Sequence, residues 1–155
     1  MEHGVARGVL SSVTACICLA LYAGGCASPG AGNLREDESA LQGRWEQQAM
    51  EGVGEKGQRV VKEVKGDTET VTTYDQGGKV IHAQTAKFRL RREGPVRVYT
   101  FYNRRVTAGP EQGRFRDSER SYLYKLRGDE LHEVWGLLEG QEGREVAIIR
   151  WKRAG

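Results

Sequence analysis

Two polar residues, His82 and Gln84, lie in a stretch whose other alternate positions are apolar. Residues two apart on a β-strand share a face, so Phe88, Leu90 and Ala86 point the same way as this pair. A few polar groups in a mostly apolar wall are typical of small-molecule sites. We therefore predict that His82 and Gln84 point inward near one end of a barrel and orient a small apolar or amphipathic ligand. A bulge before Ala86, or a strand that leaves the barrel there, would put both in water.

Catalytic and metal-binding patterns are sparse. His82 and His132 are the only histidines after Cys26. His132 and Glu133 are adjacent, so on a strand they face opposite sides and cannot share a metal. Glu133 or Glu46 inside a barrel could serve as a general acid, but the spacing singles out neither. Without a nucleophile motif or a phosphate-binding glycine loop, we expect no catalytic residue, no metal, no cofactor and no enzyme activity.

The elements that would position these residues are strands. The sequence predicts strands over residues 44–50, 59–65, 69–74, 79–92, 96–106, 121–126, 131–138 and 145–152. Glycine-containing turns such as Asp75-Gln76-Gly77-Gly78 connect them at hairpin spacing, and we find no convincing amphipathic helix. Sequential hairpins favour an up-and-down barrel over a sandwich. The predicted fold is therefore all-β, an antiparallel up-and-down barrel of about eight strands over residues 41–155. Strand 96–106 is apolar on both faces, so the sequence does not decide which of its two faces points inward.

The first and the last predicted strands each carry a distinctive group of residues. Gly43 and Trp45 open the first strand, and Arg150-Trp151-Lys152-Arg153 closes the last. A barrel removes its free edges by pairing these two strands. A large aromatic can then plug the floor beneath a cation, and Gly43 permits a close backbone approach.

Leu41-Gln42-Gly43-x-Trp45, the strand meander and the basic-aromatic last strand resemble the lipocalin-like bacterial domains. One such group is common among planctomycete lipoproteins and has no settled activity. In lipocalins the tryptophan of Gly-x-Trp packs against an arginine of the last strand. The resemblance implies that Trp45 meets Arg150, Lys152 or Arg153, and we assign Arg150.

The N-terminal region carries all three cysteines, Cys16, Cys18 and Cys26. The folded domain therefore has no disulfide and no cysteine zinc site. An apolar stretch over residues 9–22 precedes Ala23-Gly24-Gly25 and Cys26, an order that resembles a bacterial lipoprotein signal. We predict a signal peptide over residues 1–25 and lipidation (palmitate-type acylation) of Cys26. Cleavage without a lipid is the alternative.

Residues 26–40 contain small and acidic side chains and are predicted to be a flexible tether between lipid and barrel. The protein is thus expected to be exported and membrane-anchored. In a cell with two membranes, the resemblance to sorted lipoproteins favours the periplasmic leaflet of the outer membrane.

Positive charge is concentrated in residues 87–127, which carry 12 basic and 4 acidic side chains. Alternation puts Lys87, Arg89 and Arg91 on the outer face, where they would keep the barrel soluble. A bulky inward set leaves a small pocket or none: Trp45, Phe88, Leu90, Leu131 and Trp135. The alternative function is therefore a filled barrel that docks on an anionic envelope component or a protein partner through its basic face. Nucleic acid is not an expected partner, and the oligomeric state is open.

Overall fold

The computed structural model describes residues 33–48, 57–138, 141 and 143–155. The predicted signal peptide, Cys26 and residues 26–32 of the predicted tether lie outside these residues. The described elements are, in chain order, α1 (Leu34–Leu41), β1 (Gly43–Gln47), β2 (Arg59–Lys65), β3 (Thr68–Tyr74), β4 (Val80–Glu93), β5 (Val96–Ala108), β6 (Phe115–Arg116), β7 (Arg120–Arg127), β8 (Glu130–Trp135) and β9 (Ala147–Arg153).

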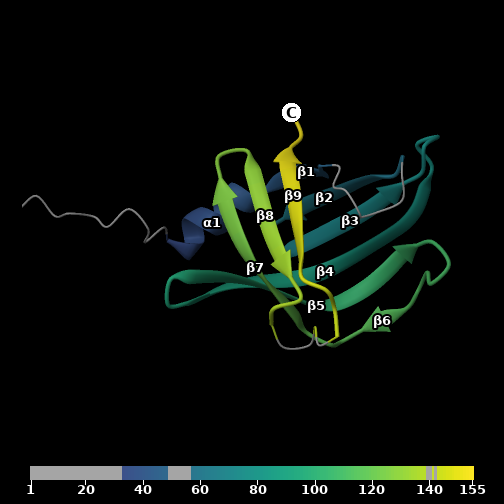
Figure 1. Ribbon diagram of the computed structural model, residues 1–155. Coiled ribbons are helices and arrows are strands. Elements are labelled where there is room, and N and C mark those ends of the chain that lie inside the picture. The colour runs from purple at the N-terminus through teal and green to yellow at the C-terminus, as the bar shows by residue number, and fades with distance from the viewer. Residues whose placement is uncertain (1–32, 49–56, 139–140, 142) are drawn as a thin grey trace, which may run out of the picture.

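Eight of these strands form a closed antiparallel barrel (Figure 1). Each strand pairs with the next from β1 to β5 and from β7 to β9, and β5 pairs with β7. β9 pairs back with β1, as the sequence predicted. β6 adds a short edge to β5 outside this ring. The all-β fold and the up-and-down barrel are therefore confirmed.

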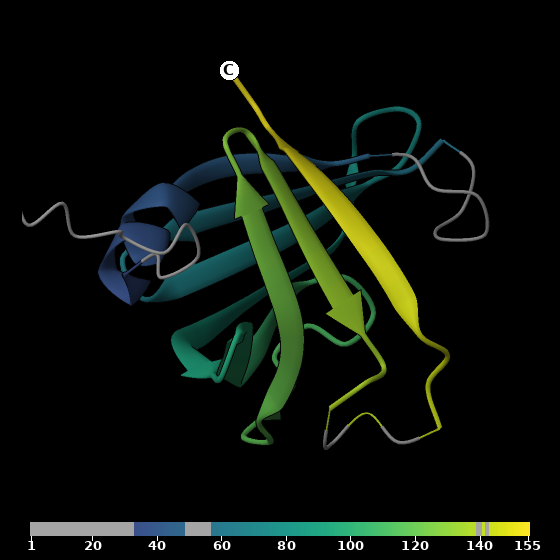
Figure 2. The same cartoon turned by 60° about the vertical axis from the view of Figure 1, so that its left-hand side comes forward.

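The two ends of the barrel differ. α1 packs against β4 and β7 at the end where β1 begins and β9 ends (Figure 2). The opposite end, where β4 and β7 begin and β5 and β8 end, carries β6 and the connection from β8 to β9 (Figure 1). We call this opposite end the mouth of the barrel.

Residues 34–40 form a helix where the sequence analysis expected a flexible tether. The Asn33 side chain accepts a hydrogen bond from the backbone N of Arg35 at 3.2 Å, and Glu36 stands at the third helical position. An asparagine cap followed by an acidic first turn stabilises a helix start. Asn33 thus caps the start of α1, and the Asn33-x-x-Glu36 spacing was the available signal.

α1 is fastened to the barrel through Asp37. Its carboxylate accepts a hydrogen bond from the Tyr124 hydroxyl at 2.7 Å and pairs with Arg97 at 3.1 Å. Leu41, at the end of the helix, is fully buried in the core. No helix among the described residues is both long and apolar enough to cross a bilayer.

Barrel closure depends on Trp45 and Arg153. They are direct partners in the β1–β9 register, and the Arg153 guanidinium lies 4.2 Å from the centroid of the Trp45 ring. Trp45 is fully buried, and its Nε1 donates a hydrogen bond to the Leu41 carbonyl at 2.8 Å. Gly43 has a φ of +109°, and a Cβ there would lie 3.1 Å from Arg153 Nη1. The predicted roles of Gly43 and Trp45 in closing the barrel therefore match the observed geometry.

The cation over Trp45 is Arg153 rather than the assigned Arg150. Residues alternate faces along a strand, so Arg153 shares the inward side with the buried Trp151, whereas Arg150 is exposed on the outer side. Arg153 also donates hydrogen bonds to the carbonyls of Gln42, at 2.7 Å, and Ala40. A cation is favourable at these carbonyls, because they end a helix.

Aromatic rings fill the interior of the barrel. Phe88, Tyr99, Tyr122 and Trp135 form a row of stacked rings with successive centroids 4.8, 4.8 and 4.7 Å apart. Such stacking stabilises a core by about 0.5–1.5 kcal/mol per pair beyond burial. The predicted inward residues all belong to this core or pack against it: Trp45, Phe88, Leu90, Leu131 and Trp135.

The orientation of β5, left open by the sequence, follows from the same core. Tyr99 and Phe101 face the interior. Val98 and Thr100, on the other face, are nevertheless at most 1 % exposed. The Thr100 and Ser121 hydroxyls form a hydrogen bond of 2.8 Å on that face. Both faces of β5 are therefore buried at its middle.

Candidate functional site

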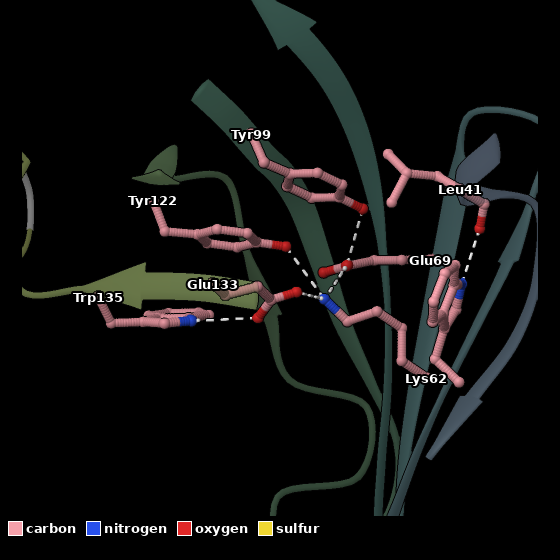
Figure 3. A network of polar contacts seen from close by, with 8 residues as sticks. Leu41, Lys62, Glu69, Tyr99, Tyr122, Glu133 and Trp135 are labelled. Carbon is pink, nitrogen blue, oxygen red and sulfur yellow. Dashed lines mark hydrogen bonds and ion pairs between the residues drawn. The ribbon is translucent and has the colours of Figure 1, made fainter. Parts of the chain in front are cut away.

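A buried ion cluster lies at the centre of the barrel (Figure 3). Lys62 of β2 extends its ammonium between the carboxylates of Glu69 on β3 and Glu133 on β8. Lys62 Nζ is 3.3 Å from Glu69 Oε2 and forms a closer ion pair with Glu133 Oε1. The three side chains are 1 % to 5 % exposed. The cluster is therefore closed to solvent.

Hydroxyl and indole groups complete the hydrogen bonding of the cluster. Tyr99 donates its hydroxyl to Glu69 Oε2 at 2.8 Å, and the lysine ammonium donates to the Tyr122 hydroxyl at 3.0 Å. Trp135 Nε1 donates to Glu133 Oε2 at 3.2 Å. The aromatic stack thus supplies both the apolar walls of the interior and its polar contacts, as Figure 3 shows.

Burial and charge set the protonation states. Burial by itself lowers the pKa of Lys62, but the nearby Glu133 and Glu69 outweigh it, so its pKa lies above the usual value. Burial first, and the two carboxylates second, raise the pKa values of Tyr99 and Tyr122 well above their usual range. The lysine is therefore charged at neutral pH, and both tyrosines are neutral hydrogen-bonding groups.

The cluster fastens three strands across the barrel. It sets one ammonium against two carboxylates, and removing the ammonium would leave buried charge without a partner. Of the two acids considered from sequence, Glu133 is inside the barrel and paired with Lys62. Glu46 is 42 % exposed beside Arg59, 3.9 Å away. The Glu133 carboxylate is therefore shielded from solvent and is part of the ion cluster in the core of the barrel.

The sequence analysis did not single out Lys62. It did contain a signal, because Val60, Lys62 and Val64 share one face of the predicted strand over residues 59–65. A lysine flanked on its own face by two valines predicts either a buried charge or a break in the pattern. Its partners, Glu69 and Glu133, come from other strands and follow only from the barrel register.

His82 and Gln84 lie at the mouth of the barrel. They pair with Thr73 and Val71 of β3, the face that also carries the buried Glu69. The register of β4 against β3 is regular over these positions, so β4 keeps its alternation. Both side chains are half-buried. They are therefore on the inward face at one end of the barrel, as alternation predicted, and nothing here tests whether they bind a ligand.

Irregularities border this regular stretch on both β4 and β5: on β4, Ile81 is an extra residue opposite the step from Thr73 to Tyr74 of β3. Asn103 and Arg104 together stand against the single residue Ala86, and Thr107 is an extra residue opposite the step from Ala83 to Gln84. These bulges bend β5 at the mouth. The bulge expected as an alternative, on the strand of His82 and Gln84 before Ala86, does not lie between His82 and Ala86, because β4 keeps one register against β3 over these residues.

A hollow of about 360 Å³ lies at the other end of the barrel, beside α1. Neither His82 nor Gln84 contributes to it. Polar side chains and the Phe88 ring both contribute to its wall, which is formed by Glu38, Ser39, Gln42, Gly66, Asp67 and Phe88.

The outer cations predicted from alternation are exposed, as expected, and each is paired. Lys87 contacts Asp67 at 2.6 Å. Arg89 forms two parallel hydrogen bonds to Glu119, at 2.7 and 2.6 Å, and Arg91 lies 3.0 Å from its neighbour Glu93. These ion pairs reduce the positive charge that this face presents.

No family model, curated protein or solved structure matches the chain. The resemblance to lipocalin-like lipoproteins therefore stays a prediction, and the closed eight-stranded barrel is consistent with it. Within the described ranges, no three His, Cys, Asp or Glu side chains are placed to hold a metal.

Proposed function

We propose that this chain is an exported, membrane-anchored envelope lipoprotein whose lipocalin-like barrel binds a small apolar or amphipathic ligand at its mouth. The observation that supports this most is the difference between the two ends. α1, Trp45 and Arg153 plug one end, whereas half-buried His82 and Gln84 stand on the inward face at the other. Inward polar groups beside aromatic rings are typical of sites that orient a largely apolar molecule.

The ligand would be held close to the mouth. The ion cluster of Lys62 and the stacked rings occupy the middle of the barrel, which leaves the deeper interior filled. Trp135, half-buried and stacked on Tyr122 at 4.7 Å, belongs to the last residues of β8 before the mouth. A bound apolar group would therefore lie near Trp135, and its polar end near the strand ends.

The filled interior supports a second candidate, an interaction module that docks on an anionic envelope component or a protein. The predicted docking face, however, carries Lys87, Arg89 and Arg91 in ion pairs with acidic neighbours. Exposed paired charges contribute little net attraction. We therefore rank docking through that face below ligand binding at the mouth.

A titration with dodecanoate, monitored by tryptophan fluorescence, tests the proposal. A ligand at the mouth should quench Trp135 saturably. His82→Leu removes one polar contact and should change the dissociation constant by about 2- to 12-fold. Arg89→Glu with Arg91→Glu is the matched control, because both residues lie outside the barrel and should leave this binding unchanged.

Docking predicts the opposite pattern. The double arginine reversal would then abolish binding to phosphatidylglycerol vesicles, added salt would weaken it, and His82→Leu would have no effect. Wild-type protein that shows no saturable quenching with dodecanoate would contradict ligand binding at the mouth.

A further inference from the structure

Four arginines gather at the mouth of the barrel: Arg104, Arg116, Arg120 and Arg144. Arg104 on β5 and Arg116 on β6 are direct cross-strand partners. Arg120 pairs with Phe101, so it lies on the core-facing side of β7. Like charges placed directly opposite each other destabilise a sheet, so this arrangement calls for a compensating group.

The described acidic residues do not supply that group. No described carboxylate lies within 4.0 Å of Arg104, Arg120 or Arg144, and Arg116 reaches Glu111 only at 3.9 Å. This separates the cluster from the outer cations, each of which has a close acidic partner. Among the described residues, Arg104, Arg120 and Arg144 therefore have no carboxylate partner, and Arg116 has only a distant one.

Partial burial strengthens the effect. Arg104, Arg116 and Arg120 are half-buried, and only Arg144 is exposed. Burial first, and then the charges of neighbouring arginines, lower the pKa values of Arg104 and Arg120. Positive groups that repel one another in a partly dry site bind an anion more strongly than exposed ones do.

A β-bulge in β5 directs Arg104 toward the arginine cluster. Asn103, the residue before it, has a φ of +51°, and it is the one non-glycine residue with positive φ in the described part of the chain. Asn103 and Arg104 both stand against Ala86 of β4. Strained backbone and bulges concentrate at binding sites, where they redirect a side chain.

We propose that Arg104, Arg116, Arg120 and Arg144 form an anion site that binds the phosphate of a phosphomonoester at the mouth of the barrel. Guanidinium forks match phosphate oxygens bidentately, and a group with nearly two negative charges suits four guanidiniums, three of them without a described carboxylate partner, better than a single carboxylate does. This inference deepens the proposed function and rests on it for the position of the ligand. Free phosphorylated compounds and phospholipid headgroups share this chemistry.

Calorimetric titration of the purified full chain tests the site, with inorganic phosphate, lauroyl lysophosphatidic acid and dodecanoate as the three probes. Wild-type protein should bind both phosphate probes. Arg104→Gln and Arg120→Gln should each weaken both by about tenfold, typical of a lost hydrogen bond to a charged group. Arg105→Gln is the matched control, because it removes the same charge from the next, exposed residue of β5 and should change binding less than about twofold.

Comparing the two phosphate probes shows whether the bound phosphate group belongs to a lipid headgroup or to a free phosphorylated compound. Tighter binding of the lysophospholipid than of inorganic phosphate would indicate a lipid headgroup, and equal binding a free phosphorylated compound. Arg144→Gln, at an exposed loop position, keeps the test valid if a strand variant fails to fold. It should also weaken phosphate binding.

The inference and the proposed function can fail separately. If dodecanoate quenches tryptophan fluorescence but Arg104→Gln and Arg120→Gln bind phosphate like wild type, the anion site is disproved and ligand binding stands. If phosphate binding depends on the arginines but no amphipathic probe quenches, the site stands and the proposed function fails. Equal loss in Arg105→Gln would show attraction by net charge alone, and would also overturn the site.

Discussion

Lys62 shows how a single residue holds this barrel together. Its side chain is 3 % exposed, and its ammonium is shared by two carboxylates and a tyrosine hydroxyl. Taking a charge out of water is costly, and only the partners around it offset that cost. The residue therefore couples the β2–β3 hairpin to β8, which is far from it in the chain.

Lys62→Met should destabilise the protein by about 3–5 kcal/mol, because it leaves Glu69 and Glu133 buried without their cation. The free energy of unfolding in urea measures the effect. Lys65→Met, on the same strand but exposed, should change stability by less than about 0.5 kcal/mol. If Lys62→Met lowers the free energy of unfolding no more than Lys65→Met does, the two carboxylates must take up protons on folding at little cost in free energy.

Trp45→Ala should cost about 3–5 kcal/mol, because a fully buried indole leaves a cavity under the closing strand. Arg150→Ala, on the outer face of β9, should cost little. Urea unfolding of both variants compares the two sides of the strand. Equal stabilities for Trp45→Ala and wild type would contradict the packing of Trp45 where β1 and β9 close the barrel.

Among the elements, sequence patterning missed the two-residue β6 and, with more effect on the fold, α1. It is eight residues long, too short to be stable in isolation. Its stability therefore comes from docking, through Asp37, Leu41 and the carbonyl contacts of Arg153. The helix in turn plugs one end of the barrel and leaves the other as the route for a ligand.

Asp37→Ala should undock this helix and cost about 1–3 kcal/mol, since Tyr124 and Arg97 lose a buried partner. Hydrogen exchange of the α1 amides, read with the urea midpoint, measures both effects. Glu38→Ala, exposed on the same helix, is the control. Unchanged amide protection in Asp37→Ala would show that Leu41 and Arg153 suffice to hold α1.

For the whole molecule, the interior predicts how stability depends on pH. The pKa values of Lys62, Tyr99 and Tyr122 are all raised on folding. A raised pKa contributes stability below the unfolded value and loses it as pH rises through the folded one. Stability should therefore fall above about pH 10, where unfolded tyrosine and lysine release protons.

Urea midpoints at about pH 8 and about pH 11 test this alkaline loss. A variant with Tyr99→Phe and Tyr122→Phe should lose less stability between the two values than wild type does, because fewer groups titrate on unfolding. A wild-type midpoint that stays constant over this range would contradict the assigned protonation states.

The proposed anchor also belongs to the scale of the whole molecule. Cys26→Ser should release the protein from the membrane fraction or block its processing, because acyl chains on Cys26 would supply the membrane affinity. Fractionation with mass spectrometry of the mature N-terminus measures both. An unmodified N-terminus in the wild-type protein would rule out the lipid.

The sequence alone determined the eight barrel strands, the barrel and the inward face of several of these strands, because alternation and turn spacing are local properties of the chain. It placed Trp45 and Gly43 at the closure and put Arg89 and Arg91 outside. Tertiary structure decided what depends on register between distant strands. Arg153 rather than Arg150 meets Trp45, Lys62 finds Glu69 and Glu133, and the arginines of β5, β6 and β7 converge. No pattern within one strand encodes such cross-strand partners, because closing the barrel is what sets them side by side.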